Sequence, residues 1–485
     1  MKNFAKLLVV AAVLMIVGSL VAMSASAAVS PNGDPKNLKP ASENVIFIMD
    51  APEGGELPGD GSGTDANNPW KPMEHEDFDP SADYPANDLN TAFYQATEEL
   101  KGTGGTIVIC GPVHLTGDQS YGGGTSQRDV RTAYFGSKVI KFTSVYNGVD
   151  YRETNGACLT VTAPAQISIS GSTIWENIRI GAGGTERVIC FEHHTTLVGE
   201  GVECFPMDSA FEGVNSYYIS LAAGKRYSKG VDVAPTLTVQ SGTYNKIVAG
   251  TWGVSDQAVM DPATTYLTIE GTTTVLGNII GTTGKISPFG GNVNITINGG
   301  TFECDIVAVG PTGMTNTDGT AKIAINGGNF ESAWSISACD AAMVNNAPAA
   351  SILDFSGWQG DLQQLAYAQY AAGEGGFTKT IFPAGVTEDQ LAGMLTPAET
   401  TAPAEEETDA PTGDDTPETN APAGNAGADD NDDQQPGGAV DVGGNEGGMN
   451  IGLIIGIVGA VIAVAAVVVV VIVLSKKKKA NKEAK

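Results

Sequence analysis

The sequence repeats one pattern four times between Leu237 and Phe330. The copies read Leu237-Thr-Val-Gln-Ser-Gly-Thr-Tyr244, Leu267-Thr-Ile-Glu-Gly-Thr-Thr-Thr274, Ile295-Thr-Ile-Asn-Gly-Gly-Thr-Phe302 and Ile323-Ala-Ile-Asn-Gly-Gly-Asn-Phe330. Their first residues are 30, 28 and 28 positions apart. Each copy alternates apolar and polar residues, as a strand does that buries every second side chain, and then turns at glycine. A strand-rich repeat of this length predicts one coil of a solenoid.

The repeat predicts an all-β fold, a right-handed parallel β-helix, in which equivalent strands of successive coils stack on one another. Inward side chains of such a stack form internal ladders. The alternation assigns to these ladders Leu237, Val239, Ile295, Ile297, Ile323 and Ile325. Phe302 and Phe330 end their copies on the inward side and are expected in the core. The alternative is an antiparallel sandwich with an accidental period.

The composition of the 485-residue chain fits a turn-dense β protein. It contains 62 glycines, and 17% of its residues are charged. Its net charge is −29, and the sequence contains no basic stripe that could neutralise the phosphates of a nucleic acid. This argues against nucleic acid as a partner.

Residues 1–27 have the three parts of a secretory signal peptide. Lys2 and Lys6 form the positive end, residues 7–21 are apolar, and Ala25-Ser26-Ala27 is a small-residue cleavage site. The chain is therefore expected to be exported.

The C-terminal part predicts a membrane anchor. Residues 396–449 read as a disordered acidic linker, because they contain 14 acidic residues and no Lys or Arg. Residues 450–474 read as a single transmembrane helix, since Ile451 to Leu474 is an unbroken apolar run of 24 residues. Residues 475–485 form a basic tail, which the positive-inside rule places in the cytoplasm. We expect a single-pass protein of the cytoplasmic membrane, with an extracellular N-terminal ectodomain on the surface of a Gram-positive bacterium.

Residues 28–99 form an N-terminal region that ends in an amphipathic capping helix, which Asn87 and Asp88 are expected to cap. One face of this helix carries Leu89, Phe93, Ala96 and Leu100. Gly104-Gly-Thr-Ile-Val-Ile109 and Gly111-Pro-Val-His114 follow it. This order resembles the opening of the pectate-lyase-like β-helix superfamily, in which a helix plugs the first coil. The resemblance covers roughly residues 100–340, implies a parallel β-helix and carries over no catalytic motif. We expect the β-helix ectodomain to span 100–395 with a C-terminal cap, for which Asp361 to Ala372 reads as a short helix.

Catalytic motifs of that superfamily are mostly missing. Asn316-Thr-Asp-Gly319 matches one polygalacturonase block, but the paired-Asp, Gly-His-Gly and Arg-x-Lys blocks do not follow it. The Trp-x-Asp-His and Arg-x-Pro-x-x-Arg blocks of pectate lyases are absent from the sequence. If the chain carries an unrecognised active site, Asp305 and Asp318 are the carboxylates to test first. The motifs favour a protein without catalytic activity.

Aromatic side chains are the binding candidates, because their faces stack on the apolar C–H faces of sugar rings. The candidates are Tyr146, Tyr151, Trp252 and Trp334. Glu192-His193-His194 is read as a solvated turn, since neighbouring strand residues face opposite sides and cannot bind one metal together. We expect neither a metal nor another cofactor.

Six cysteines are few for this length, and an exported location permits disulfides. The pairs to test first are Cys190 with Cys204 and Cys304 with Cys339. Sequence leaves their connectivity open.

These features predict a membrane-anchored, outward-facing β-helix surface protein that binds glycans or surfaces without catalysis, as an adhesin does. Its expected partner is a polysaccharide or a host or cell-surface glycan. Two alternatives remain: a polysaccharide lyase or glycoside hydrolase of the pectate-lyase-like group, and a structural surface spacer.

Overall fold

The computed structural model describes residues 30–77, 87–116, 130–162, 167–225, 233–252, 264–284, 289–311, 313–315, 318–340, 347–373 and 375–395. The predicted signal peptide, acidic linker, transmembrane run and basic tail lie outside these residues. Within the described ranges, the helices are too short or too polar to cross a membrane.

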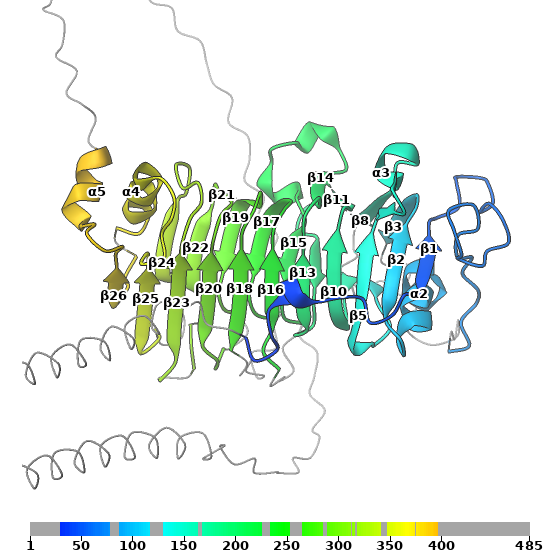
Figure 1. Cartoon of the computed structure of the whole chain (residues 1–485), viewed down its shortest axis with the longest axis horizontal. Helices are drawn as coiled ribbons and strands as arrows, with labels where there is room; N and C mark the ends of the chain where they lie inside the picture. The colour runs from blue at the N-terminus through cyan, green and yellow to red at the C-terminus, as the bar shows by residue number, and fades with distance from the viewer. Residues whose placement is uncertain are drawn as a thin grey trace, which may run out of the picture. The chain divides into compact units, whose positions relative to one another are not determined.

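Parallel strands dominate the described part of the chain and form three sheets (Figure 1). The eleven-stranded sheet contains β1 Val45–Ile48, β2 Gly105–Ile109, β5 Gly136–Thr143, β10 Gly171–Glu176, β13 Thr195–Val198, β16 Thr236–Val239, β18 Thr265–Ile269, β20 Val293–Ile297, β23 Thr320–Ile325, β25 Ala350–Asp354 and β26 Lys379–Ile381. The nine-stranded sheet contains β4 Val130–Arg131, β9 Ile167–Ser168, β12 Val188–Cys190, β15 Ser220–Ala222, β17 Thr243–Val248, β19 Thr274–Ile280, β21 Thr301–Phe302, β22 Asp305–Val309 and β24 Ser335–Cys339. The four-stranded sheet contains β3 Pro112–Thr116, β8 Cys158–Thr162, β11 Arg179–Gly183 and β14 Glu203–Pro206.

The order of the strands defines the coils. From β8 the chain enters the four-, nine- and eleven-stranded sheets in turn, as β8, β9 and β10, and then repeats this circuit. From β16 to β25 it alternates between the eleven- and nine-stranded sheets, with β21 and β22 as consecutive strands of the nine-stranded sheet, and β26 then follows β25 in the eleven-stranded sheet. Each circuit adds a parallel strand to every sheet that it enters. The described chain is therefore an all-β parallel solenoid.

The strand register confirms the four-copy repeat. Leu237 pairs with Leu267, Leu267 with Ile295, and Ile295 with Ile323, so equivalent positions of the copies lie over one another. The six predicted ladder residues are all buried in the main core. Phe302 and Phe330 are buried beside this ladder, with ring centroids 4.9 Å apart in a stacked arrangement. Stacked apolar ladders of this kind supply the hydrophobic stabilisation of the solenoid.

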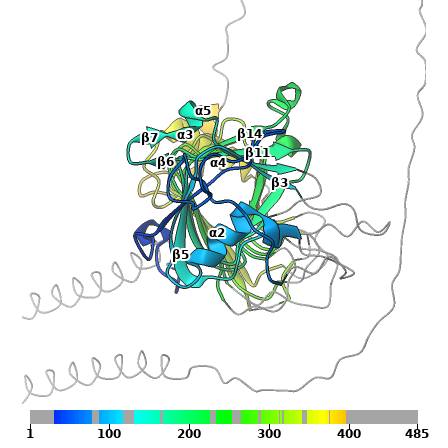
Figure 2. The same ribbon diagram turned by 90° about the vertical axis from the view of Figure 1, so that its right-hand side faces the viewer.

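Helix α2, Ala92–Leu100, lies at the N-terminal end of the solenoid (Figure 2). Its buried face includes Phe93, Ala96 and Leu100, and the Phe93 ring stacks on Phe142 of β5. The predicted helix therefore exists, but Asn87 and Asp88 do not cap it. They lie in the preceding 3-10 turn η2, Asn87–Asn90, while the Thr91 hydroxyl accepts the Tyr94 N–H at 3.1 Å and caps α2.

The remaining short elements lie in the connections and at the C-terminal end. They are the hairpin of β6 Val145–Tyr146 and β7 Val149–Asp150, the helices α3 Tyr151–Thr154, α4 Leu362–Ala371 and α5 Glu388–Leu395, and the 3-10 turns η1 Pro35–Asn37, η3 Ser209–Phe211 and η4 Asn215–Tyr217. Helix α4 matches the short helix expected near residue 361. The Asp361 carboxylate caps it by accepting the Gln363 N–H at 3.1 Å.

An N-terminal strap, defined as Ser30–Asn44, crosses the outer face of the eleven-stranded sheet before the chain enters β1. Figure 1 shows it as the blue segment that runs over the strands from β16 to β1. The Ser30 hydroxyl bonds to the Thr236 hydroxyl at 2.6 Å, and the Asn32 side-chain amide donates to the Ala234 carbonyl at 2.7 Å. This placement was not predicted from the sequence.

Two apolar side chains explain why the strap lies there. Ile174 of β10 and Leu197 of β13 are neighbours in register on the outer face, outside the main core, and both are buried. Turn η1 contacts β13 and β16, and its Pro35 is buried as well. The strap therefore removes outward apolar surface from water, which stabilises its position.

Candidate functional site

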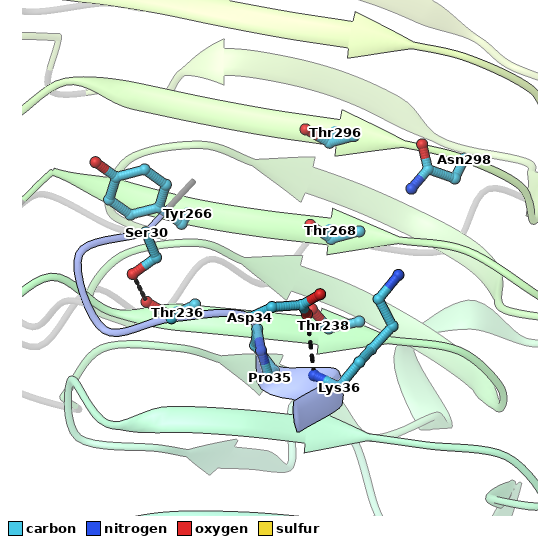
Figure 3. Close-up of a pocket in the computed structure, with 11 residues that line it drawn as sticks. Ser30, Asp34, Pro35, Lys36, Thr236, Thr238, Tyr266, Thr268, Thr296 and Asn298 are labelled. Atoms are coloured by element: carbon cyan, nitrogen blue, oxygen red, sulfur yellow. Dashed lines mark hydrogen bonds between the residues drawn. The ribbon is translucent and has the colours of Figure 1, made fainter. Parts of the chain in front are cut away.

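Two hollows border the strap on the outer face of the eleven-stranded sheet. The first hollow has a volume of about 170 Å³ and is shown in Figure 3. It is lined by Ser30, Gly33, Asp34, Pro35, Lys36, Thr236, Thr238, Tyr266, Thr268, Thr296 and Asn298. The strap forms one wall, and outward side chains of β16, β18 and β20 form the floor.

A row of hydroxyl groups runs along the floor of the first hollow. Thr238 pairs with Thr268, and Thr268 pairs with Thr296, so their side chains follow one another across three strands (Figure 3). Neighbouring parallel strands lie about 4.8 Å apart. Tyr266 lies two residues before Thr268 on β18, so it shares the outward face, and it adds a half-buried aromatic ring. The floor therefore combines regularly spaced donors and acceptors with an apolar ring.

The carboxylates near the first hollow are already engaged. Asp34 accepts the Lys36 backbone N–H at 3.0 Å and so caps η1. Glu270 accepts from Gln240 at 2.8 Å and from Asn298 at 3.2 Å, and its carboxylate lies 3.4 Å from the Lys36 ammonium. Burial acts to raise the pKa of Glu270, but these three partners outweigh it and lower the pKa. Glu270 is therefore held as a carboxylate and is poorly suited to donate a proton.

The second hollow has a volume of about 440 Å³ and lies beside the strands that enter the sheet earlier, β5, β10 and β13. Its lining is Asn32, Leu38, Tyr134, Gly136, Ser137, Val139, Ser172, His193, His194, Thr195 and Val233. Asn32 and Leu38 belong to the strap, so one segment borders both hollows.

A tight turn brings both histidines to the second hollow. Glu192 and His193 have φ angles of 45° and 66°, in the left-handed region that side chains rarely adopt. The predicted turn is confirmed, because Glu192, His193 and His194 lie between β12 and β13 and outside both strands. In this turn both imidazoles border the same hollow. The expected solvation fails for His193, which is 2% exposed.

Hydrogen bonding orients His193. Its Nδ1 lies 3.0 Å from the Val233 carbonyl, which can only accept, so Nδ1 carries the proton. Its Nε2 lies 3.4 Å from the Thr251 hydroxyl. Burial lowers the pKa of His194 to about 4, and the nearby His193 and Lys225 add to this effect. His194 is therefore neutral at physiological pH.

Tyr134 supplies an exposed aromatic ring at the second hollow. It is 73% exposed, and its ring centroid lies 6.2 Å from that of His194. Sequence reasoning missed Tyr134 and Tyr266. The period-2 alternation does place the hydroxyls of Thr238, Thr268 and Thr296 outward, and this signal could have identified the floor of the first hollow.

The four aromatic residues predicted to bind do not form one surface. Trp252 is 3% exposed and packs with Val188, Val248 and other outward residues of the nine-stranded sheet, so it has no face free for a ligand. Tyr146 and Tyr151 are half-buried and pack edge-on against Phe47 of β1. Trp334 is 59% exposed and precedes β24, several coils away.

The two candidate carboxylates are likewise separate. Asp305 begins β22 and accepts the Ser335 hydroxyl at 2.6 Å. Asp318 is exposed in the turn before β23, a strand of another sheet, and neither residue lines a hollow. Among the described residues, no three His, Cys, Asp or Glu side chains are grouped to hold a metal ion.

The predicted disulfides do not form in this structure. None of the six cysteines is joined to another by a disulfide. Cys339 pairs with Val309 of the neighbouring strand, and Cys304 lies five residues before Val309. Five residues of extended strand span about 16 Å, which is beyond the reach of a disulfide. Cys190 and Cys204 belong to different sheets, and the Cys204 thiol interacts with the Tyr244 hydroxyl inside the protein.

Comparison of the chain with protein-family models, with curated proteins and with solved structures gave no match.

Proposed function

We propose that this chain is a membrane-anchored, outward-facing surface protein that binds glycans without transforming them. The observation that carries the proposal is the strip formed by the two hollows along the strap, where hydroxyls, an amide and aromatic rings line one outer face. Sugars present hydroxyl groups at their rims and apolar C–H faces. A polar hollow with a few aromatic groups suits both.

The first hollow supports binding through its geometry. The hydroxyl row of Thr238, Thr268 and Thr296 is held by strand register, so it is ordered before a ligand arrives. Pre-ordered groups lose little conformational entropy on binding. Tyr266 offers a ring edge or face beside this row.

The charges favour binding over the alternative of a lyase or hydrolase. Glycoside hydrolysis needs two carboxyl groups about 5 to 9.5 Å apart, one of them able to donate a proton. Among the described residues, the first hollow is lined by one carboxylate, Asp34, which caps η1, and the second hollow by none. The spacer alternative gives the hollows no role.

The remaining parts of the proposal rest on the sequence. The signal peptide, acidic linker, apolar run and basic tail support display on the outside of a Gram-positive cell. The resemblance to the pectate-lyase-like superfamily supports a right-handed coil. Protease added to intact cells should cut within residues 396–449 and leave a small membrane-bound fragment, whereas cleavage at Lys476–Lys479 from outside would reverse the orientation.

A glycan array probed with the purified full chain tests the binding proposal. Tyr266→Ala and Thr268→Val should each weaken binding of a positive glycan at least about threefold, because one removes the ring and the other one hydroxyl. Tyr370→Ala is the matched control, since this tyrosine is 78% exposed on α4, away from the strap. New reducing ends or unsaturated products would overturn the non-catalytic proposal in favour of an enzyme.

A further inference from the structure

The second hollow differs from the rest of this acidic chain in the neutral character of its described lining. That lining contains no Asp, Glu, Lys or Arg. Of its two histidines, His194 is kept neutral by burial, which lowers its pKa to about 4, and His193 is a buried donor to the Val233 carbonyl. In a chain of net charge −29, a hollow lined by uncharged side chains favours an uncharged ligand.

The turn that builds the hollow is strained and heavily braced. Two consecutive non-glycine residues in the left-handed region cost on the order of 1 kcal/mol or more each. The backbone N–H groups of Glu192 and His193 donate to Gly224 and Ala223 at 3.2 and 3.0 Å, and the Glu192 carboxylate accepts the Ser170 hydroxyl at 2.7 Å. The Glu192 carboxylate is held at Ser170 and does not line the hollow, whereas the two histidines do.

We propose that the second hollow recognises a neutral sugar residue, whose C–H face rests on the Tyr134 ring. The inference rests on the proposed glycan binding and adds the class of ligand. Ser137, Ser172, Thr195 and Asn32 line the hollow and offer neutral donors and acceptors to sugar hydroxyls. His193 borders the same hollow, with its Nδ1 at the Val233 carbonyl and its Nε2 3.4 Å from the Thr251 hydroxyl.

An acidic sugar is disfavoured at this position. A uronate carboxylate entering the hollow loses water, and the described lining has no cationic side chain to compensate that loss. The Lys225 charge acts on His194, but Lys225 does not line the hollow. The negative field of the whole chain opposes it further. The hollow therefore selects neutral sugar residues because the carboxylate of an acidic sugar would find no partner in the lining. The selection does not depend on repulsion from a single nearby group.

The test uses the purified full chain and an array of gluco-, manno- and galacto-oligosaccharides, each printed beside its C6-oxidised uronic counterpart. The neutral member of a bound pair should bind at least about tenfold more tightly than its uronic counterpart. Tyr134→Ala should weaken this binding at least about tenfold and Tyr134→Phe should retain it, because the ring face is the contact. Tyr370→Ala, on the exposed face of α4, should change nothing.

A gain-of-function variant sharpens the test. Ser137 is exposed at the hollow, so Ser137→Lys should fold normally and raise the affinity for the uronic member. Equal or tighter wild-type binding of the uronic member, or unchanged binding in Tyr134→Ala, would overturn the inference while leaving glycan binding intact. No binding to any glycan on the broad array would remove the proposed function itself.

Discussion

The first and second halves of the solenoid make their turns in different ways. In the second half, residues 236–354, the described residues with positive φ are glycines, such as Gly271, Gly300 and Gly328. In the first half, five residues with side chains take this conformation: Asn147, Asn177, Glu186, Glu192 and His193. The second, regular half thus avoids backbone strain by placing glycine at positive φ. The first, irregular half carries backbone strain at residues with side chains, and those side chains are positioned by the strained turns. The second hollow is built from one of these strained turns.

The largest expected effect concerns the ladder of the regular half. Ile297 is buried between Ile269 and Ile325, so Ile297→Asp places a carboxylate among apolar side chains. The substitution should lower the free energy of unfolding by several kcal/mol or prevent folding. Chemical denaturation of the full chain measures this.

The neighbouring outward position is the control. Asn298 is exposed and donates to Glu270, so Asn298→Ala should cost about 1 kcal/mol or less. Similar damage from both changes would contradict the inward and outward assignment.

The glycine and non-glycine turns should respond in opposite directions. Gly300 has φ 108°, and a Cβ there would lie 2.8 Å from the Thr273 carbonyl oxygen. Gly300→Ala should therefore destabilise the fold by more than about 1 kcal/mol. Glu186→Gly relieves a left-handed glutamate at an exposed site and should add about 0.5 kcal/mol, since relief of strain exceeds the added chain entropy. If Glu186→Gly destabilises the protein as much as Gly300→Ala does, the turns of the two halves are not different in strain.

The irregular half should also carry a pH dependence. Burial lowers the pKa of His194 from 6.5 to about 4, with His193 and Lys225 adding to it, and Tyr134 also faces this ring. Above pH 6.5 the imidazole is neutral in both folded and unfolded chains. As pH falls from 6.5 towards 4, the unfolded chain binds a proton that the folded chain does not, so the free energy of unfolding decreases. His194→Gln should flatten this part of the profile, measured by denaturation across the window.

A titrating group of the regular half gives the contrast. Burial acts to raise the pKa of Asp354, but hydrogen bonds from Lys322 and Ser356 outweigh it and lower the pKa. The stability from Asp354 is therefore present above its unfolded pKa near 3.8 and is lost as pH falls through its lower folded pKa. A His194→Gln profile that keeps the full wild-type slope between pH 6.5 and 4 would assign that slope to other groups.

The smallest expected effect lies at the strap. The Lys36 ammonium is exposed and lies 3.4 Å from the carboxylate of the partly buried Glu270. Lys36→Met should change the free energy of unfolding by less than about 0.5 kcal/mol, because exposed ion pairs are screened by water and salt. Denaturation at low and high salt checks this, and a loss of several kcal/mol would show that the pair holds the strap in place.

The sequence was most informative where the determinants were local. Alternation within each copy identified the ladder of Leu237 and Ile295, and an apolar helix face identified α2. The strap could not be predicted, because Ser30 and Thr236 meet across 206 residues and neither carries a local signal. Trp252 was assigned wrongly because its burial depends on outward apolar residues of four other strands. The turn at Glu192-His193-His194 was predicted, but the burial of His193 was not, because it depends on a left-handed backbone that no residue type in this segment signals.

The contact between Ser30 and Thr236 also orders the events of synthesis. The strap is made near the start of the chain, yet its docking strand β16 appears about two hundred residues later, so the strap waits undocked while the intervening coils assemble. The first hollow is therefore complete only when the strap lies against β16 and when β18 and β20 have joined the sheet. A chain that stalls before β16 presents a growing solenoid with its outer surface unfinished, and recognition matures only when the earliest segment closes over it.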